Sequence, residues 1–289
     1  MDIRKIDLHM HSTMSDGTDA PEALIRKVRE AGIDLFALTD HDAIKGCEMI
    51  RSIREGDDPI LLTGVEFSCR DEHGKYHILG YDYDPESEPI RQVVALGHHY
   101  RMKKLGQRLE FIRDKFGFEF SREDTDGLYA LDNPGKPHIG NLMVRYGYAP
   151  SKEVAIRNYL DKARFPDEYV RPEQAIRGIL DSGGVPVLAH PAYGSGEELI
   201  LGSDMLSRLS RLVGFGLQGV EAFYSTFSPK LTRETLHFAK RFDLYVTAGS
   251  DYHGRNKLIL LGDTNLARAA TIPDGLKRFC ERVLPGACG

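Results

Sequence analysis

The chain lacks the cysteine pairs that a disulfide framework or a thiolate zinc site requires. It has four cysteines in 289 residues. Cys47, Cys69, Cys280 and Cys288 are widely spaced and form no C-x-x-C pair. This pattern predicts reduced thiols in a reducing compartment.

Long apolar runs are also absent. No stretch approaches ~18 consecutive apolar residues, so we expect no membrane span. The N-terminal MDIRKIDLHMHS has no apolar signal core, and the first candidate ligands begin at residue 9. We therefore expect a cytoplasmic protein that has no membrane partner.

A general excess of positive charge is missing as well. The net charge of −5 argues against a protein that binds nucleic acid throughout its surface. The charge is uneven, however: residues 98–171 hold 14 Lys and Arg against 11 Asp and Glu, whereas the remainder holds 24 against 32. A mildly basic segment above an acidic body suits an anionic ligand, although a chance fluctuation of surface charge gives the same pattern.

Short apolar runs alternate with helical patterns along most of the chain. We expect strands at 5–11, 35–41, 60–68, 75–83, 185–190, 217–223 and 244–253, and helices at 21–32, 43–56, 172–184 and 228–243. Strands that are each followed by a helix predict an α/β fold in which helices cover a parallel sheet. Seven such strands favour a closed or nearly closed barrel, built from residues 1–83 and 172–289. Residues 84–171 read as a helical insertion, a usual place for a lid or a substrate-recognition element.

Histidines and carboxylates gather where the expected strands end. His9 and His11 are two apart, so they point to one face of the first strand, and Asp16 follows in the next loop. The later strands contribute a similar set of side chains, namely His41, Glu66, His77, His190, Asp251 and His253. In alternating barrels the active site forms at this edge, from several strands. Imidazoles and carboxylates suit Zn, Mn or Fe.

Taken in order, these stretches resemble the motifs of the polymerase-and-histidinol-phosphatase (PHP) family. The motifs are DLHMHS, TDHD, GVEFS, the strand histidine His77, AHP and GSDYH, and they run through nearly the whole chain. The resemblance implies a distorted barrel of about seven strand–helix units, two or three divalent metal ions, and hydrolysis of phosphate esters.

The resemblance also implies how the ligands divide among the metals. One metal would take His9, His11, Glu66 and Asp251. A second would share Glu66 and add His77 and His190, and a third would take Asp16, His41 and His253. Glu66, Asp251 and His253 would carry catalysis, in which a hydroxide bridging the Glu66-linked pair attacks phosphorus and the third metal neutralises phosphoryl charge. We expect Asp40 to orient the ring of His41, and Asp42 to cap the following helix.

Substrate specificity is expected to lie in the basic segment. GKPHIGNLMVRYGY resembles a stretch of the nucleotide phosphatase branch of the family, and it offers Lys136, His138 and Arg145 as substrate-binding residues. Solvated surface charge is the alternative for Lys136 and Arg145. The chain departs from that branch at HPAYGSG and DKARFPDEY, where an arginine and a G-K-G are often found. Arg255 and Lys257 are further candidates to supply the missing cation.

Several functions remain open from the sequence. The preferred one is hydrolysis of a small phosphorylated metabolite, a nucleotide or a sugar phosphate, with release of inorganic phosphate. A cyclic phosphodiesterase that then hydrolyses the monoester is the first alternative, followed by a 3′,5′-nucleoside bisphosphate phosphatase or a 5′–3′ oligoribonuclease. The acidic body offers no long basic track, so no stable nucleic-acid partner is expected. An amidohydrolase-like C–N hydrolase, or a binding module with an inactive site, fits the full ligand set less well.

Overall fold

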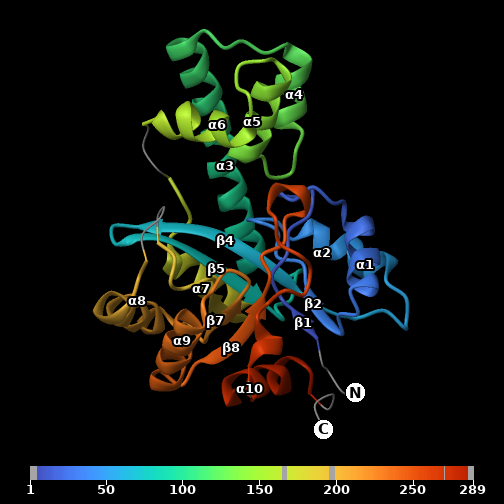
Figure 1. Ribbon diagram of the computed structural model, residues 1–289, viewed down its shortest axis with the longest axis vertical. Coiled ribbons are helices and arrows are strands. Elements are labelled where there is room, and N and C mark those ends of the chain that lie inside the picture. The colour runs from blue at the N-terminus through green and yellow to red at the C-terminus, as the bar shows by residue number, and fades with distance from the viewer. Residues whose placement is uncertain (1–4, 165–167, 195–198, 270, 286–289) are drawn as a thin grey trace.

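The strands of the computed structural model form two sheets that lie side by side near the middle of the molecule (Figure 1). The structure describes residues 5–164, 168–194, 199–269 and 271–285. Strands β1 (Ile6–Asp7), β2 (Leu35–Ala37) and β3 (Ile60–Leu62) form the first sheet. The second contains β4 (Gly64–Asp71), β5 (Gly74–Tyr81), β6 (Val185–Leu188), β7 (Gly219–Tyr224) and β8 (Tyr245–Gly249), in that order.

The first sheet is parallel throughout, as the alternation of strands and helices predicts. Helices α1 (Pro21–Glu30) and α2 (Lys45–Ile53) connect its strands. Leu24 and Val28 of α1 are fully buried, and so is Phe36 of β2. A strand covered on both faces is expected to be apolar along its whole length, which explains why β2 reads LFA.

The second sheet is mixed, so the expectation of a wholly parallel sheet is wrong there. β4 and β5 form an antiparallel hairpin in which Asp71 pairs with Gly74, and β5 also runs antiparallel to β6. Two residues can only reverse the chain, whereas a parallel pair needs a crossover of a dozen residues or more. The run at 60–68 accordingly divides between β3 and β4. Only β6, β7 and β8 are mutually parallel.

The described strands do not form a single closed sheet. Isolated bridges nevertheless link the two sheets on both sides: Met10 pairs with Tyr252, and His41 pairs with Glu66. The first bridge joins the segment after β1 to the segment after β8, and the second joins the end of β2 to β4. Both bridges therefore lie among the chemically important residues.

The segment 84–171, which the sequence predicts to be an insertion, is helical. Its helices are α3 (Glu88–Phe116), α4 (Arg122–Tyr129), α5 (Lys136–Arg145), α6 (Lys152–Asn158) and the 3-10 turn η1 (Leu160–Lys162). In Figure 1, α3 rises from the sheets and α4 to α6 gather at its far end. Leu105 and Ile112 of α3 join Leu142 and Met143 of α5 in a buried cluster separate from the sheet core.

The remaining helices pack around the second sheet. They are α7 (Pro172–Asp181), α8 (Gly202–Phe215), α9 (Pro229–Arg241) and α10 (Asp274–Val283), with 3-10 turns η2 (Gly254–Asn256) and η3 (Leu266–Arg268). The expected helices at 21–32, 43–56, 172–184 and 228–243 correspond to α1, α2, α7 and α9. None of the helices in the described ranges has both the length and the apolar character needed to cross a bilayer.

Three of the four cysteines fall within the described residues. Cys47, Cys69 and Cys280 are buried and are not joined in a disulfide within the described ranges. Cys288 lies outside the described residues.

Candidate metal centre

Nine histidine and carboxylate side chains from seven segments of the chain meet at one end of the two sheets. They are His9, His11, Asp16, His41, Glu66, His77, His190, Asp251 and His253, the set proposed from the sequence. His9 and His11 follow β1, and His41 follows β2. The β4–β5 hairpin places His77 diagonally opposite Glu66 on one face, because Glu66 pairs with Leu79 and His77 with Ser68.

Glu66 lies at the middle of the cluster. Its Oε2 is 3.3 Å from His9 Nε2, 3.2 Å from His11 Nε2 and 3.0 Å from His41 Nδ1. Its Oε1 is 2.9 Å from His77 Nδ1 and 3.5 Å from His190 Nε2. One carboxylate therefore faces five imidazoles and joins both halves of the cluster.

Two aspartates complete the cluster on its other side. Asp251 Oδ1 is 3.3 Å from His11 Nε2 and 3.3 Å from His253 Nδ1. Asp16 Oδ1 is 3.2 Å from His253 Nε2 and 3.9 Å from His41 Nε2. Asp251 has a left-handed backbone (φ 59°), a conformation that non-glycine residues adopt mainly where the surroundings impose it.

The inward atoms of this cluster are not satisfied by hydrogen bonds. Five buried atoms of the cluster have no hydrogen-bond partner among the described residues: His9 Nε2, His11 Nε2, Asp16 Oδ1, His41 Nδ1 and Glu66 Oε1. An unsatisfied buried polar atom costs about 1–3 kcal/mol, and more when it is charged. Five such atoms aimed at one space fit cations held among them.

The distances define three overlapping groups that could hold a metal ion: His11, Asp16, His41 and His253; His9, His11 and Asp251; and His41, Glu66 and His77. These groups share ligands differently from the division that the family resemblance implies. His41 stands beside Glu66 as well as Asp16, and His11 lies near both aspartates. His190 contacts Glu66 without belonging to any of the three groups.

The surroundings in the cluster keep Glu66 ionised and His41 neutral. Burial opposes ionisation of Glu66, but the neighbouring His77, His9 and His41 outweigh it and hold the pKa of Glu66 well below its usual range. Burial lowers the pKa of His41 well below that of a free imidazole. Metal ions bind the carboxylate form of an acid and the neutral form of histidine. Glu66 and His41 are therefore in the binding form.

Outer contacts orient the cluster, and the sequence analysis missed the most important of them. Glu221 of β7 is fully buried. Its Oε1 lies 2.9 Å from His9 Nδ1, and its Oε2 accepts the backbone N–H of His190 at 2.8 Å. Tyr224 and Lys257 donate to Asp251 Oδ2 at 2.7 and 2.5 Å. One feature of the sequence could have identified Glu221: it lies inside the apolar run LQGVEAF, where an acid is expected to be buried. A fully buried acid is nearly always paired.

Two expected roles next to His41 are wrong. Asp40 accepts hydrogen bonds from the backbone and hydroxyl of Ser12 and from Ser15, so it fixes the loop after His11 rather than the ring of His41. Asp42 does not cap α2, whose N-cap is Ile44. Its carboxylate instead binds the backbone N–H of Ser68, at 3.0 Å, and Arg101, at 2.6 Å.

The five predicted substrate-binding residues lie in different surroundings. Lys136 lines a cleft beside the cluster and pairs with Asp161. His138 accepts the N–H of Gly135 through Nδ1 at the start of α5. Arg145 pairs with Asp124 and is largely exposed, outside the lining of the cleft. Arg255 is exposed, while Lys257 reaches Asp251.

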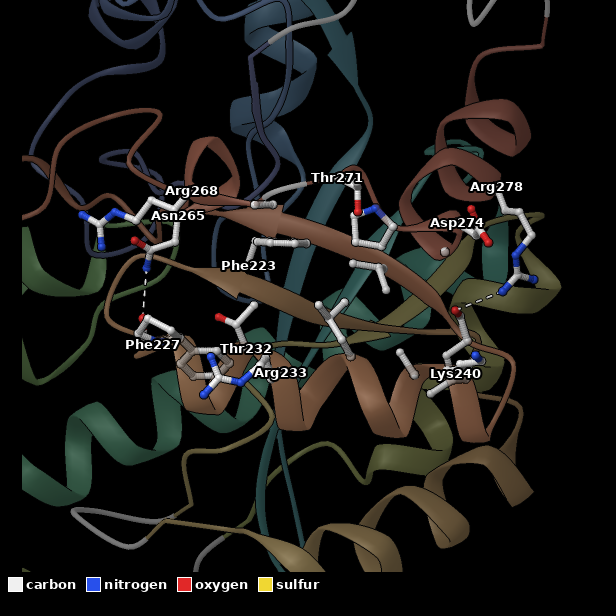
Figure 2. Close-up of a pocket in the computed structure, with 18 of the residues that line it drawn as sticks. Phe223, Phe227, Thr232, Arg233, Lys240, Asn265, Arg268, Thr271, Asp274 and Arg278 are labelled. Carbon is white, nitrogen blue, oxygen red and sulfur yellow. Dashed lines mark hydrogen bonds between the residues drawn. The ribbon is translucent and has the colours of Figure 1, made fainter.

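Two cavities are large enough to be compared as substrate sites, and they differ in whether they reach the cluster. The cleft, of about 250 Å³, includes Asp16, His41 and His77 in its wall and therefore opens onto the cluster. A larger cavity, of about 850 Å³, lies between α9 and the strands β7 and β8, where Phe223 and Phe227 form part of its wall (Figure 2). None of the nine clustered residues lines the larger cavity. The smaller cleft is thus the one connected to the cluster.

Comparisons with known proteins agree with this geometry. The model of the PHP domain matches residues 7–167. The chain is 30% identical to a phosphoribosyl 1,2-cyclic phosphate 1,2-diphosphodiesterase of Eggerthella lenta, over 86% of this chain and 94% of that protein. It is 26% identical to a 5′-3′ exoribonuclease of Haemophilus influenzae, over 86% of this chain and 90% of that protein.

A solved structure is also similar to this chain. It is a proposed metal-dependent phosphoesterase of Bifidobacterium adolescentis, which superposes with a TM-score of 0.80 at 27% identity, over 96% of both chains. These similar proteins share hydrolysis of phosphoester bonds, although their substrates differ. The chain therefore belongs to the PHP family and is a metal-dependent phosphoester hydrolase.

Proposed function

We propose that the protein hydrolyses a small phosphorylated metabolite, a nucleotide or a sugar phosphate, and releases inorganic phosphate. The observation that carries the proposal is the set of five buried, unsatisfied atoms around Glu66, in a cluster whose Asp16, His41 and His77 line a small cleft. In this proposal the two bridged sheets work as a distorted barrel with the site at its mouth, and residues 84–171 act as the substrate-recognition insertion.

Three divalent ions, of Mn, Fe or Zn, would be held by the nine clustered residues. The donor set supports this, because it combines imidazole with carboxylate and contains no thiolate. Bound divalent ions lower the pKa of water and neutralise charge on phosphoryl oxygens. In this proposal Glu66, Asp251 and His253 carry catalysis as ligands of these ions.

The chain's own residues prepare the site for this reaction. The Glu66 carboxylate is surrounded by five imidazoles. Glu221 fixes the ring of His9 and the backbone at His190. Tyr224 and Lys257 hold one oxygen of Asp251, which leaves the other directed at the cluster. Asp40 keeps the loop that carries Asp16 close to the site through Ser12 and Ser15. Such fixed groups give electrostatic stabilisation without having to reorganise during the reaction.

Opening a cyclic phosphate, followed by hydrolysis of the monoester, is the second candidate. The similarity to a cyclic phosphodiesterase over most of both chains favours it. Action on RNA ends is the third candidate, because an exoribonuclease is among the similar proteins. The small cleft and the net charge of −5 favour a metabolite over a polymer.

A phosphate-release assay across substrates tests the proposal. Purified protein is stripped with a chelator, reloaded separately with Mn²⁺, Fe²⁺ or Zn²⁺, and given monoesters, bisphosphates, cyclic diesters and short RNA. Chromatography of the products is run beside it, because cleavage of a diester yields a monoester or a nucleotide and no inorganic phosphate. We expect metal-dependent turnover of small esters at rates well above those for RNA. Products from RNA alone would reject the metabolite assignment, and no product from any ester would reject hydrolysis of phosphoesters.

A further inference from the structure

The larger cavity, between α9 and the strands β7 and β8, lies outside the metal centre and has no part in the reaction proposed there. The 3-10 turn η3 and the first turn of α10 complete its wall (Figure 2). Its volume of about 850 Å³ falls within the roughly 300–1,000 Å³ of pockets that bind small molecules. The cavity is therefore large enough for a ligand of its own.

Apolar side chains line most of this cavity. Phe223 of β7 and Val246 of β8 lie on its sheet side. Residues of α9 face them at intervals of three, four and three positions, which share one side of a helix, namely Pro229, Thr232, Leu236 and Ala239. A lining of this kind favours a ligand with an apolar body.

Two arginines mark one end of the cavity. Arg233 of α9 and Arg268 of η3 line it near Phe227, as Figure 2 shows, and we call this the arginine end. Both arginines are exposed, and no carboxylate of the described residues lies within ion-pair distance of either guanidinium. A guanidinium presents its N–H donors in a planar fork that matches the two oxygens of a carboxylate. The arginine end therefore suits an anionic group.

The opposite end of the cavity already contains negative charge. Arg278 pairs there with Asp243, at 3.0 Å, and Asp274 lies 3.8 Å from Lys277. Asp243 and Asp274 are the only carboxylates that line the cavity within the described ranges. An anion at this end would be repelled by them. The distribution of charge thus gives the ligand a direction, with its anionic group at the arginine end.

The lining also distinguishes between kinds of apolar body. Phe223 and Phe227, the aromatic residues of the wall, are only 2% and 3% exposed, so neither presents a ring face on which a nucleobase could stack. Arg233 and Lys240 are seven residues apart on α9, which is about 10 Å along the helix axis. A flexible aliphatic chain of medium length fits this space better than a flat aromatic ring.

We propose that the larger cavity binds a medium-chain fatty acid, with its carboxylate at the arginine end and its chain along Phe223 and Val246. This site is separate from the metal centre, and binding there requires neither metal ions nor hydrolysis. The inference therefore goes beyond the proposed function, and the two can fail independently.

Calorimetric titration of chelator-treated protein tests the site, because a carboxylate then has no metal ion to bind. The ligands are hexanoate, octanoate and decanoate, with decanol as the uncharged analogue and decyl phosphate as the analogue with another head group. Wild type is compared with Arg233→Met and Arg268→Met. Arg241→Met is the matched control, because it removes an exposed arginine of α9 that does not line the cavity.

We expect decanoate to bind wild type at one molecule per chain. Affinity should rise roughly three- to fourfold for each added methylene, the scale of burying one such group. Arg233→Met and Arg268→Met should each weaken decanoate binding roughly 3- to 10-fold, since a charge-assisted hydrogen bond contributes less at an exposed position. Arg241→Met should bind decanoate as wild type does, and decanol should bind equally to all four proteins.

Four results would overturn the proposal. The first is absence of decanoate binding to wild type. The second is an affinity that does not change with chain length, which would leave only a surface anion site. The third is a loss of affinity in Arg241→Met as large as that in the two cavity variants, which would indicate unspecific attraction. The fourth is tighter binding of decyl phosphate than of decanoate, which would exclude the carboxylate as the preferred head group.

Discussion

Glu221 Oε1 lies 2.9 Å from His9 Nδ1, and both side chains are fully buried. The same carboxylate accepts the backbone N–H of His190 through its other oxygen. One acid on β7 thus positions two histidines that lie far apart in the sequence. A carboxylate behind a ligating histidine fixes the orientation of its ring and raises its basicity.

Replacing this acid tests its positioning role. Glu221→Gln should weaken metal binding by roughly 10–100-fold, because the amide cannot stabilise the proton on His9 Nδ1 as a carboxylate does. Competition with a graded chelator measures the affinity. Glu234→Gln is the control, since the Glu234 side chain accepts the backbone N–H of Gly202 and lies outside the metal cluster. Equal affinities in the two variants would show that Glu221 is dispensable.

Asp16 is expected to act through one metal only. Asp16→Asn should release one ion per chain and lower kcat by roughly 10²–10³, the scale of losing one electrostatic stabiliser. Metal analysis and steady-state kinetics on p-nitrophenyl phosphate measure both effects. Asp19→Asn alters the same loop but removes a partner of Lys27 and Tyr252 instead. Full activity and unchanged metal content in Asp16→Asn would leave Asp16 with a role in the turn alone.

Lys104 should reduce the stability of the unliganded protein in a pH-dependent way. Its pKa is about 6 in the folded chain and about 10.5 for a free side chain, so between these values folding releases a proton. Wild-type stability therefore rises with pH across this window. Lys104→Met lacks this effect and should be more stable at pH 7 by on the order of 2–4 kcal/mol.

The advantage of Lys104→Met should shrink as the pH approaches 10. Denaturant unfolding at pH 7 and pH 10 measures it, with Lys103→Met as the control for loss of a lysine on the same helix. Arg101, Arg108, Asp42 and Lys75 surround Lys104, and because burial lowers the pKa of Lys75 as well, wild type and Lys103→Met share the contribution of Lys75 to the pH dependence. A constant difference in the free energy of unfolding between the two pH values would contradict the prediction.

Arg145 should contribute little to substrate binding, despite its place in a motif-like stretch. Its guanidinium pairs with Asp124, and its side chain is 63% exposed. Exposed ion pairs contribute about 0–1 kcal/mol, so Arg145→Ala should change kcat/KM by no more than about twofold. Steady-state kinetics of Arg145→Ala and of wild type on the same substrate measure the change in kcat/KM. A tenfold or larger loss would show that Arg145 reaches the substrate.

Much of the site could be predicted because strand ends converge. His9, His41, His190 and Asp251 each follow a strand, and neighbouring strands in an α/β fold bring their ends to one edge. The β4–β5 hairpin was harder to predict, since an apolar run does not specify the direction of its neighbour.

The outer contacts depend on tertiary packing that periodicity does not encode. Glu221 reads as one polar residue in an apolar strand, and its partners lie 31 and 212 residues away. The positive charge of residues 98–171 predicted an anion-binding segment. Which cations of this segment line the cleft depends on how α3 packs against Asp42, and the sequence pattern does not contain that packing.

Metal stoichiometry in wild type and Glu66→Gln tests the central claim most directly. Each protein is purified, loaded with Mn²⁺ and freed of excess metal, and the ions per chain are measured alongside phosphate release from p-nitrophenyl phosphate. The control is Glu72→Gln, an exposed hairpin position that pairs with Arg171. We predict roughly three ions in wild type and the control, with loss of at least one ion and most activity in Glu66→Gln. One ion or none in active wild type, or full metal content and activity in Glu66→Gln, would contradict the account.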